Sequence, residues 1–268
     1  MSPLLLILRQ LILVAAMIVG LVGCKAEISG REMPDDPVPV FSGFSLASFQ
    51  EISLASPATL TEQVKFIGNG GLTLGVSVPE LAEGALAPLI IALHFSDGNG
   101  PDYLQYSIEP AYASLGAIIL SPTVPKGTTW QKQSNLDMLR DLIDLSLAQW
   151  PVDPAKIAVV GYSMGGTGAW AVATQYPTRV QTVIGMASNP APYIDALSPA
   201  QHAFIIHPEL DTSVSVSELE SLFNKMNARG INTRMEVVDG ARHADWDLAS
   251  SALLLSADWL GLEVWKTQ

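Results

Sequence analysis

Ile157-Ala-Val-Val-Gly-Tyr-Ser-Met-Gly-Gly166 is the stretch that decides the fold of this chain. Its apolar, β-branched start predicts a buried strand, and a helix-forming run follows from Met164. In the order strand, sharp turn, helix, a G-x-S-x-G motif holds a serine hydroxyl exposed on a strained turn, and Gly161 and Gly165 leave room for that turn. A chain with 21 glycines can contain the motif by chance, so its position after a strand is the informative part. We therefore predict that Ser163 is a nucleophile.

A serine hydroxyl is a weak nucleophile at neutral pH, so this prediction requires a histidine base and an acid, in the chain order serine, acid, histidine. His243 lies in the glycine-containing loop Asp239-Gly-Ala-Arg-His243, after the alternating segment 233–238. A loop at the carboxyl end of a strand is where a base can reach a serine on a central strand. We predict that His243 is the base, and we interpret His207, at the end of the strand 202–206, as structural.

The acid is less sharply specified. Asp211 is the first choice because it follows the predicted strand 202–206 in the loop Pro208-Glu-Leu-Asp-Thr212. Glu209 is the alternative, since one loop can aim either carboxylate inward. Asp195 and Asp239 are further alternatives, which we interpret as solvated loop acids.

Acyl-transfer chemistry also needs two backbone N–H donors for the oxyanion of a tetrahedral intermediate. One is expected from Met164, the residue after the nucleophile, and the other from the loop after an earlier strand. Pro88-Leu-Ile-Ile-Ala-Leu93 is predicted to be that strand, and residues 94–100 are predicted to form that loop. Ser96 and Phe95 remain open as the second donor.

The remaining elements alternate between strands and helices, which indicates a mostly parallel sheet covered on both faces. A hairpin is predicted first, turning at Gly68-Asn-Gly-Gly71. The predicted strands are 63–67, 72–78, 88–93, 117–120, 156–162, 180–186, 202–206 and 232–238, and the predicted helices are 103–115, 135–150, 164–176, 217–229 and 245–260.

Together, the His94 loop, the Ser163 turn, Ile206-His-Pro-Glu-Leu-Asp211 and Gly240-Ala-Arg-His243 resemble the α/β-hydrolase superfamily. Within it, residues 88–260 are similar to small carboxylesterases related to dienelactone hydrolases, phospholipase/carboxylesterases and polyhydroxybutyrate-depolymerase-like esterases. The resemblance implies an α/β-hydrolase fold and a triad of Ser163, Asp211 and His243.

Two departures from these families bear on function. His94-Phe-Ser96 stands where they usually have His-Gly, and Ser163 stands where dienelactone hydrolases proper use cysteine. The resemblance therefore implies a serine esterase that cleaves carboxylic esters through an acyl-enzyme. A serine peptidase or acyltransferase with the same triad, and a degenerate hydrolase that serves as a binding lipoprotein, are the alternatives.

The cleft is expected to be open. Only the 14 residues 188–201 separate two strands where many α/β-hydrolases insert a helical cap, so we predict no large cap domain. Trp130 and Trp246 are candidates to line the cleft and bind substrate, although packing in the core or at the rim is the favoured interpretation for each.

The N-terminus carries a separate signal. Residues 4–22 are almost wholly apolar, broken by Arg9 and Gln10, and Leu21-Val-Gly-Cys24 resembles a bacterial lipobox, whose cysteine is lipidated and becomes the first mature residue. An uncleaved anchor helix is the alternative, but the run after Arg9 is shorter than the roughly 20 apolar residues of a spanning helix. We predict an exported protein, anchored in the bacterial cell envelope by lipid on Cys24.

Three segments follow from this interpretation: a signal peptide over 1–23, a tether and lead-in segment rich in proline, serine and acids over 24–58, and one catalytic domain over 59–268. The net charge of −12 disfavours nucleic acid and anionic lipid as partners, which leaves a small or polymeric ester as substrate and the N-terminal lipid as the membrane contact. No metal-ligand spacing, phosphate loop or dinucleotide fingerprint occurs, so no cofactor and no metal are predicted. Cys24, the only cysteine, precludes an intrachain disulfide.

Overall fold

An eight-stranded sheet is the centre of the molecule, with strands in the order β1-β2-β4-β3-β5-β6-β7-β8. The computed structural model describes residues 58–65 and 71–266, which lie in one compact unit, Val40–Gln268. The predicted signal peptide, Cys24 and the tether lie outside the described residues. The strands are β1 (Ala58–Lys65), β2 (Gly71–Val78), β3 (Ala87–Leu93), β4 (Ile118–Pro122), β5 (Val152–Tyr162), β6 (Thr182–Met186), β7 (His202–Pro208) and β8 (Asn232–Val238).

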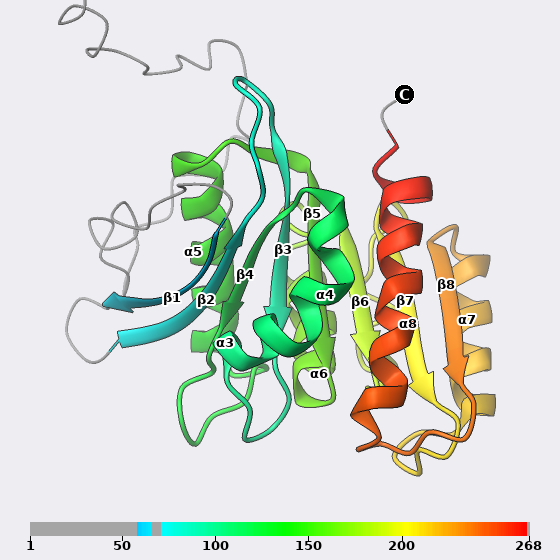
Figure 1. The fold of residues 1–268 in the computed structure, drawn as a ribbon. Helices are drawn as coiled ribbons and strands as arrows, with labels where there is room; N and C mark the ends of the chain where they lie inside the picture. Colours follow the sequence, from blue (N-terminus) through cyan, green and yellow to red (C-terminus); the bar gives the residue numbers. More distant parts are fainter. Residues whose placement is uncertain (1–57, 66–70, 267–268) are drawn as a thin grey trace, which may run out of the picture. The chain divides into compact units, whose positions relative to one another are not determined.

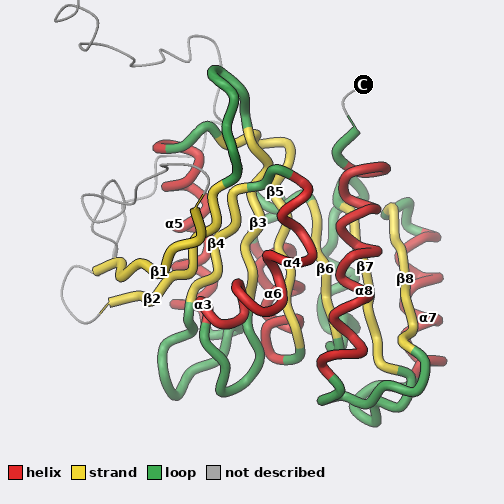
Figure 2. Tube along the Cα trace, in the orientation of Figure 1, coloured by secondary structure: helices red, strands yellow, loops and turns green. Residues whose placement is uncertain are grey.

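Strand β2 is antiparallel to both β1 and β4, and every other neighbouring pair is parallel. Helices cover both faces (Figures 1 and 2). One face carries α3 (Gly100–Tyr103), a π-helical segment (Leu104–Ile108), α4 (Glu109–Tyr112) and α8 (Trp246–Trp259), and the other carries α5 (Gln133–Gln149), α6 (Met164–Gln175) and α7 (Val216–Ala228). The predicted mostly parallel sheet with helices on both faces is confirmed.

The central strands are apolar on both sides because both faces are buried. On β3, Leu89 and Ile91 pack into the core beneath α5, α6 and α7, while Ile90 and Ala92 pack beneath α8 and the helical segment before β4. All four side chains are 0% exposed. A continuous apolar run, rather than alternation, is therefore the sequence pattern of this strand.

Element boundaries differ from the predictions where local chemistry extends them. The helix predicted from Tyr103 begins at Gly100, because the Asn99 side chain accepts a hydrogen bond from the Asp102 amide at 2.9 Å and caps the first turn. Strand β5 begins at Val152, four residues earlier than predicted. In the hairpin, Lys65 pairs with Gly71, so its turn lies outside the described residues.

The connection between β6 and β7 folds down onto the domain. Ile194 and Leu197 are each 1% exposed and pack in the core. The Arg229 guanidinium donates hydrogen bonds to the carbonyls of Ile194 and Leu197 and so fastens this connection to the end of α7. Across the described residues no large cap covers the sheet, and none of their helices is both long and apolar enough to cross a membrane.

Candidate active site

The carboxyl ends of six parallel strands, β4, β3, β5, β6, β7 and β8, lie at one edge of the sheet. In the register of the sheet, Leu93 pairs with Gly161, Tyr162 with Met186, and Pro208 with Val238. Loops that leave aligned strand ends converge, and this edge is where open α/β sheets bind ligands. The loops after β3, β5, β7 and β8, which carry the residues predicted from sequence, therefore meet here.

Ser163 occupies the sharp turn between β5 and α6. Its backbone has φ 54° and ψ −114°, a strained conformation for a non-glycine residue, and its N–H donates to the Met186 carbonyl at 2.9 Å. The flanking glycines permit this turn: a Cβ at Gly161 would lie 2.1 Å from the Gly165 oxygen, and one at Gly165 would lie 1.9 Å from the Leu93 oxygen. The turn therefore projects Ser163 at the strand end and packs α6 tightly against β3.

The structure brings Ser163, His243 and Asp211 into one hydrogen-bonded chain. Ser163 Oγ lies 2.8 Å from His243 Nε2, and His243 Nδ1 lies 2.6 Å from Asp211 Oδ2. Because a carboxylate only accepts, the neutral imidazole carries its proton on Nδ1, and Nε2 is left to accept from the serine hydroxyl. This geometry suits removal of the serine proton by His243.

Asp211 is held ionised and in place. Its side chain is 1% exposed. Burial alone raises the pKa of this carboxyl, but hydrogen bonds from the Ser213 hydroxyl (2.6 Å), the Ser213 amide (2.8 Å) and His243 outweigh it, and the pKa lies below the ordinary aspartate value. Ser213 was not predicted from sequence, although an aspartate that binds the amide two residues on is a recognised turn pattern.

The alternative acids lie elsewhere. Glu209 is exposed, and its Oε2 accepts from the Gly240 amide at 2.8 Å, which ties the Asp211 loop to the His243 loop. Asp195 forms an exposed ion pair with Lys225 at 2.8 Å, and Asp239 is exposed. Of the four candidate acids, only Asp211 contacts His243.

Tyr162 contacts the loop that carries His243. Its hydroxyl donates to the backbone carbonyl of His243, and its ring stacks near the imidazole at 6.0 Å between centroids. Burial, followed by the negative charges of Asp211 and Asp245, raises the pKa of Tyr162, so the hydroxyl remains a donor at neutral pH. The residue before the serine thus anchors the loop that carries the histidine.

Tyr162→Phe is expected to lower kcat for ester hydrolysis about three- to tenfold with little change in KM, because one hydrogen bond that positions the His243 loop is lost. Tyr112→Phe is the matched control, since Tyr112 is a buried tyrosine whose hydroxyl bonds to Ser256 Oγ at 2.6 Å, away from the site. Steady-state kinetics on both variants would contradict this role for Tyr162 if the two behaved alike.

The loop after β3 is braced by His94. Its Nε2 accepts from the Val124 amide at 3.0 Å, so Nδ1 carries the proton and donates to the Phe95 carbonyl at 2.6 Å. Burial lowers the pKa of His94, although the bond to Phe95 opposes the shift, and the neutral ring is favoured. His94 therefore links the loop after β3 to the loop after β4.

A cleft of about 490 Å³ lies beside the serine turn. Ser96 and Met164 line it together, whereas the Phe95 ring packs edge-on against Tyr103 and Tyr162. Most of the residues that line the cleft are small or polar. The full lining is His94, Ser96, Asp97, Gly98, Thr123, Val124, Pro125, Lys126, Gly127, Thr128 and Met164. The two loops predicted to supply oxyanion donors are thus adjacent.

Trp130 does not line this cleft, so its candidate role in substrate binding is wrong. The side chain is 0% exposed, its Nε1 donates to the His94 carbonyl at 2.9 Å, and its ring meets the His94 ring edge-on at 5.3 Å. A large aromatic side chain with a satisfied N–H is stable in a core, and this one supports the His94 loop from below. Trp246 begins α8, and its side chain is outside what the structure describes.

His207 is structural, as interpreted from sequence. The side chain is 0% exposed, and its Nε2 donates to the Val214 carbonyl at 3.0 Å, closing the loop that carries Asp211. Burial is the main cause that lowers the pKa of His207, and burial likewise lowers that of His202.

A pH dependence of stability follows. A histidine whose pKa is lower in the folded protein than in the unfolded chain binds protons more weakly in the folded state. Its contribution to the free energy of unfolding is therefore complete above the unfolded pKa of about 6.5, and it is lost as the pH falls toward the lower pKa of the folded state. The Tm is expected to fall with pH below about 6.5. His207→Gln retains a donor for Val214 and should make this decline shallower; an unchanged slope in thermal melts across pH would contradict the assignment.

Within the described residues, no cluster of three or more His, Cys, Asp or Glu side chains is arranged to hold a metal ion. The contacts of the site are those of a proton-transfer chain, from Ser163 through His243 to Asp211.

The chain has the α/β-hydrolase fold. It is similar to the structures of a ferulic acid esterase (16% identity, TM-score 0.64, 76% of this chain and 97% of that one) and of the fluorophosphonate-binding serine hydrolase F of Staphylococcus aureus (13% identity, TM-score 0.63, 77% and 99%). The predicted fold class is confirmed.

Two comparisons of sequence are narrower. The dienelactone hydrolase family model matches residues 123–248, which include Ser163, Asp211 and His243. Acetylxylan esterase A of Emericella nidulans is 26% identical over 115 residues, and the match spans 38% of this chain and 38% of that protein's length.

Proposed function

We propose that the protein is a serine esterase that hydrolyses carboxylic esters through an acyl-enzyme. The observation that carries this proposal is the contact chain from Ser163 Oγ to His243 Nε2 (2.8 Å) and from His243 Nδ1 to Asp211 Oδ2 (2.6 Å), built on a strained strand-to-helix turn. The match to the dienelactone hydrolase family over 123–248 supports the same reaction class.

In the proposed reaction, Ser163 Oγ attacks the ester carbonyl carbon while its proton passes to His243 Nε2. Asp211 keeps the imidazole in the required tautomer and stabilises the imidazolium, and does not itself take up the proton. His243 then protonates the departing alcohol, and a water activated by the same histidine hydrolyses the acyl-enzyme. The imidazole thus serves as base and acid in turn.

The oxyanion donors are proposed to be the backbone amides of Met164 and Ser96. Met164 is the first residue of α6, and amides in the first turn of a helix have no acceptor within that helix. Ser96 is favoured over Phe95 because it lines the cleft beside Met164, whereas the Phe95 ring packs against aromatic neighbours. Two such donors aimed at one point stabilise the developing charge.

The cleft indicates a short acyl group. Most of its lining residues are small or polar, and none is a leucine, an isoleucine or a large aromatic residue that would hold a long acyl chain. An acetyl ester of a carbohydrate is the first natural substrate to test, since the relative from Emericella nidulans is an acetylxylan esterase.

The test is turnover on a panel of soluble nitrophenyl esters, acetylated xylose and a peptide anilide. We expect kcat/KM to be highest for acetyl or propionyl esters and at least about tenfold lower for acyl chains of twelve carbons. Hydrolysis of the anilide in the absence of ester turnover would indicate a peptidase, and failure on every substrate would favour the degenerate binding protein.

We further propose that the mature protein is exported and held in the bacterial cell envelope by lipid on Cys24. The support is the sequence Leu21-Val-Gly-Cys24 after an apolar run, with no second cysteine in the chain. With a net charge of −12, electrostatic attraction to anionic lipid offers no substitute for that anchor.

Cys24→Ser is expected to remove lipid attachment and to shift the protein from the detergent phase to the aqueous phase on phase partitioning. The check is mass spectrometry of the N-terminal peptide from wild-type protein. A mature chain that starts with an unmodified Cys24, or with Met1, would rule out the lipoprotein.

A further inference from the structure

Strand β8 ends the sheet with an open edge. All seven of its residues pair in register with β7 on one side, and no other described strand pairs with it. Open edges invite pairing with another chain, and proteins usually guard them with charged side chains, especially lysine, with proline or with a bulge. Asn232-Thr-Arg-Met-Glu-Val-Val238 contains no lysine or proline and its pairing shows no bulge, and its two charges, on Arg234 and Glu236, are opposite in sign.

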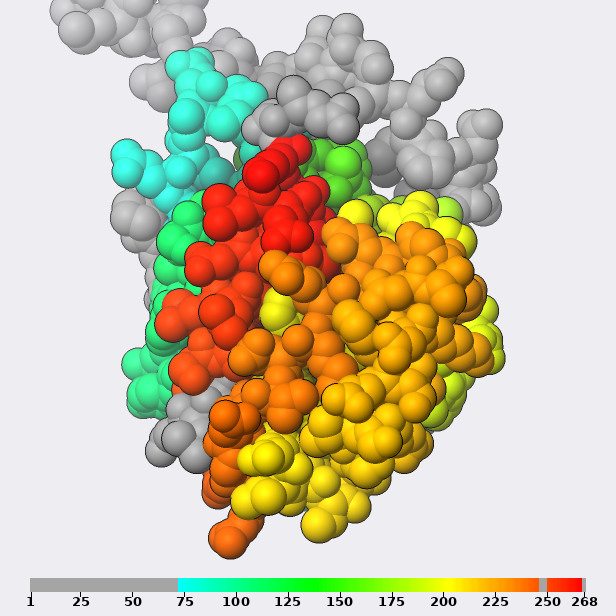
Figure 3. All heavy atoms as spheres, turned by 90° about the vertical axis from the view of Figure 1, so that its right-hand side faces the viewer, coloured from blue at the N-terminus to red at the C-terminus, as the bar shows by residue number. Residues whose placement is uncertain are grey.

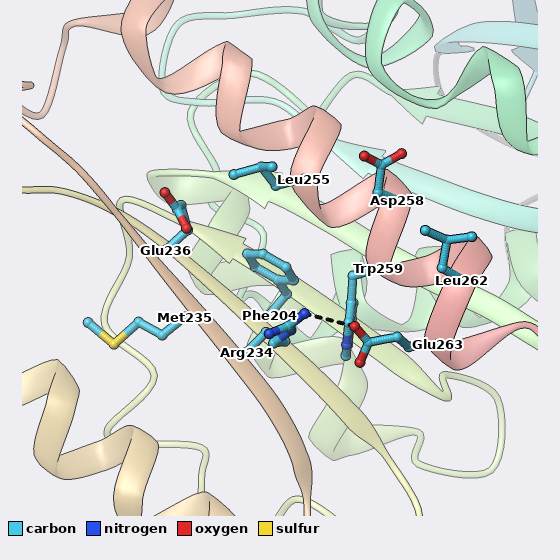
Figure 4. A pocket seen from close by; sticks show the side chains of 9 residues that line it. All are labelled: Phe204, Arg234, Met235, Glu236, Leu255, Asp258, Trp259, Leu262 and Glu263. Atoms are coloured by element: carbon cyan, nitrogen blue, oxygen red, sulfur yellow. Dashed lines mark hydrogen bonds and ion pairs between the residues drawn. The ribbon is translucent and has the colours of Figure 1, made fainter.

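A groove of about 260 Å³ runs between this edge and α8. Figure 3 faces this side of the molecule, where the surface is hollowed between the red C-terminal helix and the orange strand. Phe204 and Trp259 are buried within the groove, whereas Leu255 and Leu262 line it at 48% and 62% exposure (Figure 4). Exposed leucines beside an open strand edge form a surface suited to docking.

The charges on β8 are placed two residues apart on one face. Side chains alternate along a strand, so Arg234 and Glu236 both point to the α8 side, and both line the groove. Arg234 pairs with Glu263 at 2.7 Å. Among the described residues, no side chain forms an ion pair with Glu236.

We propose that β8 pairs antiparallel with β8 of a second copy of this chain, about a two-fold axis that passes between the two Met235 residues. In an antiparallel pair, residues directly opposite point to the same face, so a symmetric β8 pair must be centred on one residue. Centring on Met235 places Arg234 opposite Glu236 of the other copy, twice.

The neighbouring registers are unfavourable. Centring on Arg234 or on Glu236 would place two like charges directly opposite each other, which destabilises a strand pair. The Met235 register also pairs all seven residues, from Asn232 opposite Val238 to Val238 opposite Asn232. The two-fold axis keeps both α8 helices on one face of the joined sheet, where Leu255 and Leu262 of each copy flank the junction.

Charge variants test the register. Arg234→Glu and Glu236→Arg each put like charges opposite each other, so each alone should raise the dimer dissociation constant at least about tenfold in analytical ultracentrifugation. An equimolar mixture of the two should dimerise again, because one copy then presents two acids and the other two arginines. Wild-type protein that is monomeric up to about 100 µM, or a mixture no tighter than its components, would overturn the proposal.

A cysteine crosslink tests the contact in the full-length protein. Opposed residues of an antiparallel pair have Cα atoms about 4.5–5.5 Å apart, within the range that a disulfide spans. Met235→Cys should therefore give a covalent dimer on mild oxidation, and peptide mapping should find the two introduced cysteines joined. Ser134→Cys, exposed on α5 at a distance from β8, is the control and should not crosslink. A Met235→Cys protein that gives no link between the two positions 235, or that crosslinks no more than Ser134→Cys, would overturn the dimer.

Discussion

Ser163→Ala is expected to leave the fold intact and to lower kcat for a soluble ester by at least about 10⁴-fold, since loss of the nucleophile leaves only oxyanion and binding effects. The fold should survive because the turn depends on Gly161 and Gly165 and on the Ser163 amide, and not on the hydroxyl.

Ser96→Ala is the matched control for this loss. Ser96 lines the same cleft, and alanine retains its backbone amide, so kcat should change by only a few fold. Thermal melts of both variants would show that the proteins are folded. If Ser163→Ala keeps more than a few per cent of wild-type kcat, Ser163 is not the nucleophile.

The second large effect is expected at the acid. Asp211→Asn keeps the shape of the side chain but can bind the wrong imidazole tautomer, and a loss on the order of 10⁴-fold in kcat is expected. The Ser213 hydroxyl and amide, which now bond to Asp211 Oδ1, can still be satisfied by the asparagine oxygen, so the loop should remain folded.

Glu209→Gln is the matched control for Asp211→Asn. Its amide oxygen can still accept from the Gly240 amide, and kcat should fall less than about tenfold. Kinetics of both variants on one ester decide between the two acids: a large loss for Glu209→Gln beside near-normal Asp211→Asn would mean that the acid is Glu209.

The features that were predictable from sequence are those set by local pattern and strand order. The turn at Ser163 follows from an apolar strand and two glycines, and aligned parallel strands carry Asp211 and His243 to the same edge of the sheet. The fold class follows from the alternation of strands and helices. The boundary shifts at Gly100 and Val152 arise from a cap and from added strand pairing, which periodicity does not detect.

The features that were not predictable depend on contacts between distant segments. The Tyr162 hydroxyl reaches a carbonyl 81 residues away, and the His94 ring accepts from an amide 30 residues away. Trp130 follows a strand end, a position that favours a cleft residue, but its ring is the support beneath the His94 loop. No pattern in the sequence distinguishes an aromatic residue that lines a cleft from one that packs beneath it.

The most direct test of the account is to map the site of fluorophosphonate labelling by peptide mass spectrometry. An activated serine forms a covalent phosphonyl adduct, so we expect one adduct, on the peptide that contains Ser163, and none in Ser163→Ala. An adduct on any other residue, or equal labelling of the Ser163→Ala variant, would contradict the proposal that Ser163 is the nucleophile.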